Sequence, residues 1–238
     1  MNGTRAEQPA AAAGLAGTRR LRAERQKLIA HLILVVVGIL FLMPFVWLVI
    51  TSFKTDEEIF VVPVRWWPSE MQWSNYVNAV QAIPFFRYTF NTIWIAFLCV
   101  TGVVLIAPFV AYGFARIDFK GRNALFLVMM SALMLPFQVT MIPIYVMFNK
   151  IDLVDSYWPI VLSSWFGTGI AYYLFLMRQF FMGIPHELTE SAKIDGASEF
   201  RIYAQIMLPL SKPAVLTVGV FTFLGAWGDF QGTLIYLN

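Results

Sequence analysis

Long stretches without a charged side chain are the feature that most constrains the fold of this chain. Lysine, arginine, aspartate and glutamate make up 13% of its 238 residues, and 59% of the residues are hydrophobic. Uncharged stretches cover residues 28–53, 88–115, 123–149 and 156–177, and a fifth, 213–238, contains only Asp229. A helix needs about 20 apolar residues to cross a hydrocarbon core of about 30 Å. The sequence therefore predicts an all-α, polytopic membrane protein with five spanning helices.

The distribution of basic residues predicts how these spans are oriented, because lysine and arginine collect in cytoplasmic loops. With a cytoplasmic N-terminus, thirteen of the 17 basic residues lie inside, six of them in a basic tail over residues 1–27. We expect the first 24 residues of this tail to be disordered. The same orientation makes residues 54–87 an extracytoplasmic loop and residues 183–212 a cytoplasmic loop. The net charge of +3 follows from this asymmetry and does not indicate a nucleic-acid partner.

The sequence contains no motif that indicates an enzyme. His186-Glu187 begins like a zinc-protease motif, but Glu190 stands where the second histidine is required. The chain has no G-x-x-x-x-G-K-[ST] phosphate loop and no Gly-x-Ser-x-Gly nucleophile elbow. Cys99 is the only cysteine, so a disulfide within the chain is excluded. We predict no metal, cofactor or catalysis in this chain, and any energy for its work must come from a partner.

The polar segment ELTESAKIDGASEFRIYAQIMLPLSKP, residues 187–213, interrupts this apolar sequence. Pro185 suits the first position of a helix, which we expect to run to about Asp195. Gly196 permits a sharp turn, and Asp195 or Ser198 can cap a second helix. An amphipathic helix on lipid normally has a polar face rich in lysine and arginine, whereas acids are equally prominent here. The pattern favours docking to a protein.

This segment resembles the EAA loop of permease subunits in ABC importers. The resemblance rests on Glu190-Ser191-Ala192, Asp195-Gly196-Ala197, Tyr203, Ile206, Leu208-Pro209-Leu210 and Pro213. Other segments are similar to carbohydrate-type importers, especially to the second permease of maltose-type systems. They are Trp67-Pro68, Asn75-Tyr76, Phe90-Asn91-Thr92, AYGFARIDFKGR (111–122) and MLPFQVTMIPIY (134–145).

The resemblance implies a transmembrane domain over residues 28–238 that forms a heterodimer with a second permease in a prokaryotic plasma membrane. It implies two further partners, a cytoplasmic ATPase dimer that binds ATP and Mg²⁺ and an extracytoplasmic solute-binding protein. The residues that it assigns to ATPase coupling are Glu190, Ser191, Ala192, Asp195, Gly196, Ala197 and Tyr203. Alanine and phenylalanine are usual at the positions of Ser191 and Tyr203, and the stretch Trp227-Gly228-Asp229-Phe230 lacks the usual amide. The family core has six spans, of which five are visible in this sequence.

Polar residues inside the predicted spans indicate a solute pathway. On straight helices, Asp229 and Gln138 each lie 16 residues from the inner edge of the membrane, which is about 24 Å at about 1.5 Å per residue. Asn91 enters the same outer half from outside, and the prolines of segment 136–143 are expected to kink the third span. The pathway candidates are Asn91, Gln138, Trp227 and Asp229. Each can instead satisfy a neighbouring helix or simply pack.

The leading hypothesis is a non-catalytic permease subunit of an ATP-driven importer for a sugar or sugar-like solute. A secondary transporter driven by an ion gradient needs acid or histidine relays in the membrane, and only Asp229 is available. A membrane scaffold that recruits a cytosolic protein is the third hypothesis, and the kinked spans argue against it. Co-purification of an ATPase separates the first hypothesis from the second, and solute uptake separates it from the third.

Overall fold

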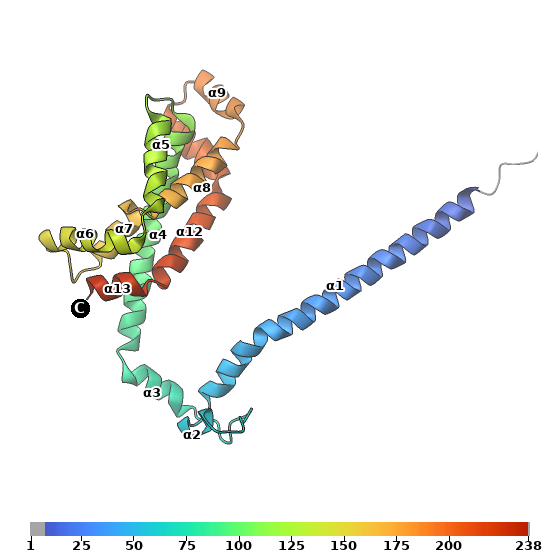
Figure 1. Cartoon of the computed structure of the whole chain (residues 1–238). Helices are drawn as coiled ribbons and strands as arrows, with labels where there is room; N and C mark the ends of the chain where they lie inside the picture. Colours follow the sequence, from blue (N-terminus) through green and yellow to red (C-terminus); the bar gives the residue numbers. More distant parts are fainter. Residues whose placement is uncertain (1–7, 238) are drawn as a thin grey trace, which may run out of the picture. The chain divides into compact units, whose positions relative to one another are not determined.

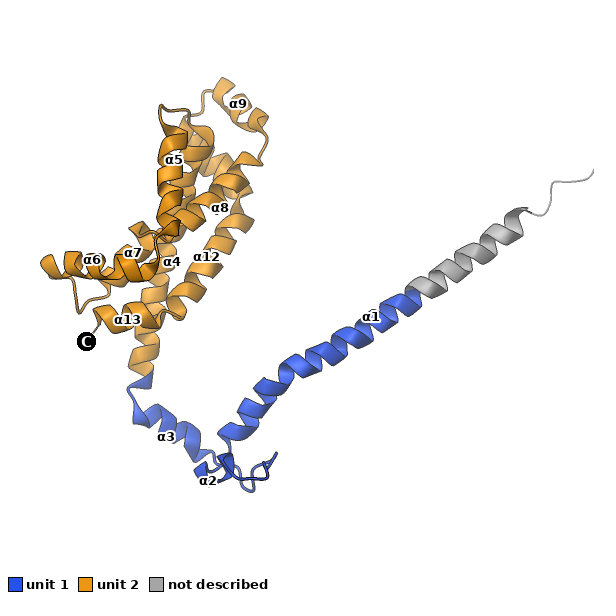
Figure 2. Cartoon of the chain, in the orientation of Figure 1, with its two compact units in different colours: residues 1–85 blue, residues 86–238 orange. Residues whose placement is uncertain are grey.

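The structure is a computed structural model that describes the backbone of residues 8–237 and the side chains of residues 24–237. All regular elements in these described residues are helices (Figure 1). The chain divides into two compact units, residues 1–85 and residues 86–238 (Figure 2). The predicted all-α class is confirmed.

The first unit consists of α1 (Gln8–Ser52), α2 (Asp56–Ile59) and α3 (Ser74–Ala82). The part of α1 from Glu24 to Ser52 is long and apolar enough to span a membrane, as predicted. The expectation of a disordered tail is wrong from Gln8 onward, because α1 already begins there. The tail is rich in alanine and arginine, which have high helix propensity, and Pro9 is tolerated in a first turn.

The loop that follows α1 is folded around a buried lysine. The Nζ of Lys54 donates a hydrogen bond of 2.6 Å to the carbonyl of Arg65 and lies 4.2 Å from the ring centre of Trp47. The Asn75 amide donates to the carbonyls of Ser52 and Lys54 at 3.1 and 2.9 Å. These bonds join the end of α1 to the start of α3. They give the predicted outer loop a defined structure.

The second unit contains the other helices. They are α4 (Phe85–Arg116), α5 (Arg122–Ser131), the 3-10 helix η1 (Ala132–Met134), α6 (Phe137–Lys150), α7 (Trp158–Phe166), α8 (Ile170–Met182), α9 (His186–Ile194), α10 (Glu199–Ile202), the π-helix η2 (Tyr203–Met207), α11 (Leu208–Leu210), α12 (Lys212–Trp227) and α13 (Phe230–Tyr236). Two further stretches, Phe85–Arg116 and Trp158–Met182, are long and apolar enough to span. Two bent pairs of helices pass the same test together, so the described residues hold three candidate spans, or up to five if each pair counts as one.

Two breaks in the chain correct the straight-helix expectation. The third span bends by 101° between Met134 and Phe137, where Pro136 has extended backbone angles. Proline disfavours helical angles in the residue before it, which explains a break rather than a gentle kink. The fifth span ends at Trp227, and Asp229 caps the separate helix α13. Depths calculated from helix rise are therefore wrong for Gln138 and Asp229, since each lies beyond a break.

Two apolar clusters hold the second unit together. The first joins α4, α8 and α12 through fully buried side chains such as Val103, Met177 and Val218, and it continues into the segment after α9 through Ile202 and Met207. The second cluster joins α4, α6, α7 and α13. Figure 1 shows α9 at one end of this unit and α13 at the other. The polar segment and the spanning helices thus share one core.

The contact between α4 and α7 depends on a glycine. The indole of Trp165 lies directly against Gly102, and its Nε1 donates a hydrogen bond of 3.0 Å to the carbonyl of Leu98. A methyl group at position 102 would overlap this indole, and overpacking a tight core costs about 1–3 kcal/mol. We expect Gly102→Ala to lower the midpoint of thermal unfolding of the detergent-purified protein.

The matched control for this prediction is Gly113→Ala on the same helix. The methyl group added there meets no atom within 4 Å. Its unfolding midpoint should equal or exceed that of the wild type. Equal midpoints for the two variants would contradict the prediction, because Trp165 would then move aside at no cost.

Candidate functional site

The loop of residues 183–212, here called the corner loop, is helical on both sides of a sharp turn, as predicted. Helix α9 precedes the turn, and α10, η2 and α11 follow it. Gly196 makes the turn with a φ of +79°, a left-handed angle that glycine adopts without steric cost. The N–H of Ala197 donates a hydrogen bond of 2.9 Å to the carbonyl of Ala192 and closes α9. The hydroxyl of Ser198 accepts a hydrogen bond of 3.3 Å from the N–H of Arg201 and caps α10.

The predicted coupling residues divide into anchors and surface residues. Ala192 and Tyr203 are buried in the first apolar cluster. The others are exposed or half-buried: Glu190, Ser191, Asp195, Gly196 and Ala197. The buried pair fixes the corner loop to the spanning helices, and the remaining residues are accessible to a partner.

The two most exposed large apolar side chains of the corner loop are not among the predicted coupling residues. Ile194 is 87% exposed, at the end of α9 and four residues after Glu190, and Phe200 is 67% exposed on α10. Residues four apart lie on the same face of a helix. The signal that could have found Ile194 is its place at the end of a mostly polar helix, four residues after Glu190. Exposed apolar side chains beside a carboxylate are typical of a protein-docking surface.

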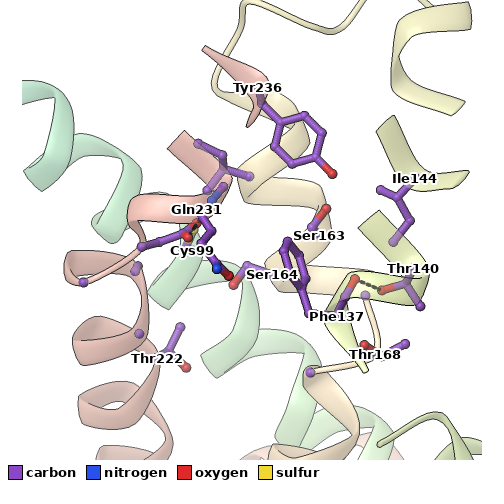
Figure 3. A pocket seen from close by; sticks show the side chains of 18 of the residues that line it. Cys99, Phe137, Thr140, Ile144, Ser163, Ser164, Thr168, Thr222, Gln231 and Tyr236 are labelled. Atoms are coloured by element: carbon purple, nitrogen blue, oxygen red, sulfur yellow. Dashed lines mark hydrogen bonds between the residues drawn. The ribbon is translucent and has the colours of Figure 1, made fainter. Parts of the chain in front are cut away.

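One cavity of about 710 Å³ lies among α6, α7, α8, α12 and α13 (Figure 3). The polar groups in its lining are mainly hydroxyls from different helices. Those labelled in Figure 3 are Thr140, Ser163, Ser164, Thr168, Thr222 and Tyr236. The lining also includes Asp229 and Gln231. We call this space the hydroxyl cavity.

A second cavity of about 860 Å³ lies among the first half of α4, the start of α7, and α13. Its lining is rich in aromatic rings: Tyr88, Trp94, Tyr157, Trp158 and Trp227. Asn91 and Asp229 also line this space, which we call the aromatic cavity. The structure thus brings three of the four pathway candidates together. Gln138 is exposed and lines neither cavity, although its neighbour Phe137 borders the first.

Asp229 has a clear local role. Its Oδ1 accepts a hydrogen bond of 2.8 Å from the N–H of Gly232 and so caps α13. A Cβ at Gly232 would overlap this carboxylate, which explains why glycine stands there. Asp229 borders both cavities as well. Asp229 therefore satisfies a backbone N–H of α13, which was one of the two alternatives for this residue. It also lies beside both cavities, as a pathway residue would.

Residues 103–237 match the family described as the binding-protein-dependent transport system inner membrane component. This chain belongs to that family. It is 33% identical over 192 residues to a putative ABC transporter permease protein, ORF2, of Caldicellulosiruptor sp., covering 81% of this chain and 69% of the relative. The predicted resemblance to permease subunits of ABC importers is confirmed.

Two further relatives are named for the solutes of their systems. The diacetylchitobiose uptake system permease protein NgcG of Streptomyces coelicolor is 29% identical, covering 85% of this chain and 66% of the relative. The arabinooligosaccharides transport system permease protein AraQ of Halalkalibacterium halodurans is 31% identical, covering 82% and 70%. This chain thus spans about two thirds of the length of these relatives.

The fold is also that of a solved importer. A chain in the crystal structure of a bacterial ABC transporter that imports the acidic polysaccharide alginate superposes with a TM-score of 0.77 at 21% identity, covering 91% of this chain and 76% of that chain.

As an ABC permease, this protein is integral to a membrane and is a non-catalytic subunit. In the described residues, no group of three or more histidine, cysteine, aspartate or glutamate side chains is arranged to hold a metal ion.

Proposed function

We propose that this ABC permease forms one half of the solute pathway of an ATP-driven sugar importer in a prokaryotic plasma membrane. A second permease subunit forms the other half, an ATPase dimer docks on the corner loop, and an extracytoplasmic binding protein delivers the solute. The observation that carries the proposal is the exposed surface of α9 and α10, anchored in the core of a chain from this transport family.

The corner loop has the properties that docking to an ATPase requires. Ile194 offers an apolar contact and Glu190 a charge on the same face of α9. A Cβ built at Gly196 meets no atom within 4 Å, so a partner can approach the turn closely. Ala192 and Tyr203 anchor the loop, so a displacement of its surface is passed to the spanning helices. ATP and Mg²⁺ are bound by the partner, which supplies the energy.

The aromatic cavity suits a sugar. Its volume of about 860 Å³ lies in the range of ligand sites, which is about 300–1,000 Å³. The apolar face of a sugar ring stacks on aromatic side chains such as Trp94 and Trp158, and the carboxylate of Asp229 and the amide of Asn91 can accept hydrogen bonds from its hydroxyls. The names of the relatives, which include diacetylchitobiose and arabinooligosaccharides, support this solute class.

The two alternative functions receive less support. A secondary transporter needs acid or histidine relays in the membrane, whereas the carboxylate of Asp229 accepts the hydrogen bond that caps α13.

The proposal is tested by purifying the tagged protein from membranes of its host and identifying the proteins that remain bound. We expect an ATPase and a second permease. Membrane vesicles should take up labelled arabinotriose or diacetylchitobiose only when ATP is present inside. Uptake driven by an ion gradient without ATP would support the secondary transporter. If the tagged protein binds a cytosolic protein that has no ATPase activity, and the vesicles take up no sugar, the result would support the scaffold hypothesis.

A further inference from the structure

The motif AYGFARIDFKGR, residues 111–122, has no role in the function proposed so far. Two of its side chains, Tyr112 and Arg116, lie at the end of α4 that contacts the corner loop. We propose that Tyr112 and Arg116 are positioning residues that join α4 to the corner loop, so that movement of the loop on the ATPase is passed along α4 to the solute cavities. This inference rests on the proposed function and deepens it.

Tyr112 joins α4 to the far side of the corner. Its hydroxyl donates a hydrogen bond of 2.7 Å to Oε2 of Glu199, the first residue of α10. The other carboxylate oxygen, Oε1, lies 2.7 Å from the Nζ of Lys193 on α9. One carboxylate therefore connects three helices, α4, α9 and α10. Hydrogen bonds to an ionised group are short and strong, so this bridge is suited to transmit force.

Arg116 joins α4 to the near side of the corner. Its Nη2 donates a hydrogen bond of 2.5 Å to the carbonyl of Phe181 and a second hydrogen bond to the carbonyl of Ile184. These carbonyls belong to the end of α8 and the turn that leads into α9, where helix carbonyls lack partners within the helix. Tyr112 and Arg116, one turn apart on α4, thus bond to residues on both sides of α9, Glu199 after it and Ile184 before it.

The burial of the Arg116 guanidinium costs free energy, so the stability of the fold does not by itself account for it. Its Nε and Nη1 atoms are buried and have no hydrogen-bond partner among the described residues. Burying donors without partners is costly, and an apolar side chain in the same place would avoid the cost. What the buried guanidinium adds is its two hydrogen bonds to the carbonyls of Phe181 and Ile184, which supports a role in connecting elements.

Aromatic packing stiffens the contact between α4 and the corner loop. The ring of Tyr112 packs against Phe181, with centroids 6.1 Å apart, and against Tyr203 at 5.4 Å. Tyr203 also packs against Phe109 of α4 at 5.5 Å. Tyr203 is one of the predicted coupling residues, so the same ring cluster contains residues from α4, α8 and the corner loop. A displacement of the loop cannot leave α4 unmoved without opening this cluster.

The other end of α4 reaches the cavities. Cys99 lines the hydroxyl cavity, and Asn91 and Trp94 line the aromatic cavity. The helix is continuous from Phe85 to Arg116 and passes through Pro108 without a break. At about 1.5 Å per residue, it carries a displacement at Tyr112 over about 30 Å to Asn91. In this second unit, α4 is therefore a direct connection between the corner loop and both cavities.

The test uses the assembled transporter and needs no knowledge of the solute. A single-cysteine reporter is made with Cys99→Ala and Asn91→Cys, which puts a thiol in the aromatic cavity. The rate of labelling by a water-soluble maleimide is measured without nucleotide and after trapping with ATP and vanadate. We expect the two rates to differ at least threefold in the parent. The difference should disappear in Tyr112→Phe and in Glu199→Ala, while the ATPase still co-purifies.

Tyr145→Phe is the matched control. The Tyr145 ring stacks on Tyr236 in the second apolar cluster, away from the corner loop, and removal of its hydroxyl should leave the difference in labelling intact. Equal rates in the two states of the parent, or an unchanged difference in Tyr112→Phe and Glu199→Ala, would overturn the inference. Loss of the ATPase from these two variants would show that the contacts only maintain the loop, and would also overturn it. Absence of an ATPase from the parent would overturn the proposed function and the inference with it.

Discussion

Gly196→Trp is expected to separate this permease from its ATPase. The indole would project from the turn between α9 and α10, where a Cβ added at position 196 meets no atom of this chain within 4 Å. The variant should therefore fold, but the indole would occupy the space that the partner needs. Loss of about 3 kcal/mol of binding free energy corresponds to about a hundredfold weaker association. The amount of ATPase that co-purifies with the tagged permease, at equal permease, measures this loss.

The control for Gly196 is the other glycine with a left-handed angle. Gly121 has a φ of +84°, and a Cβ added there also meets no atom within 4 Å. Tryptophan at either position takes on a left-handed backbone that costs about 1–2 kcal/mol. Gly121→Trp should therefore be destabilised to the same degree yet retain the ATPase. Equal retention by the two variants would remove Gly196 from the docking surface.

Asp229→Asn is expected to reduce uptake of the transported sugar about tenfold without disturbing α13. Asparagine caps helices about as well as aspartate, so the bond to Gly232 is preserved while the charge is lost. A hydrogen bond to a charged group contributes about 1.5–3 kcal/mol, and losing part of that corresponds to the tenfold change. The measurement is the initial rate of ATP-dependent uptake into membrane vesicles, together with the amount of assembled transporter.

Two further variants separate the roles of Asp229. Asp229→Ala removes both the cap and the charge, so it should reduce uptake and also destabilise the protein by about 1 kcal/mol. Asp118→Asn removes an acid from the exposed turn before α5 and should leave uptake unchanged. If Asp229→Asn transports at the wild-type rate, the carboxylate serves only as a helix cap.

The turn of the corner loop and the helices on either side of it could be predicted from the sequence, because local rules determine them. Glycine at 196 adopts the left-handed angle, and Ser198 caps the helix that follows. The anchoring by Tyr112 and Arg116 could not be predicted. Their partners, Glu199 and Phe181, lie 87 and 65 residues away in the sequence, and no local pattern reports such contacts.

The cavities were predicted less well, for a physical reason. Uncharged stretches give the number of spans but not their breaks, and Pro136 and Gly228 break two of them. The membrane depths calculated for Gln138 and Asp229 were wrong as a result. Asn91, Trp227 and Asp229 nevertheless border one cavity, whereas Gln138 is outside both. Most of the aromatic lining comes from α4 and α7, and only the folded chain shows which of its rings meet.

A photo-cross-link from the corner loop tests the docking proposal most directly. Benzoylphenylalanine placed at Ile194, which is 87% exposed, is irradiated in native membranes, and the same residue placed at Leu216, 69% exposed on α12, serves as the control. The account predicts a covalent adduct with an ATPase from position 194 and none from position 216. An adduct with lipid only, or no protein adduct, from position 194 would contradict it.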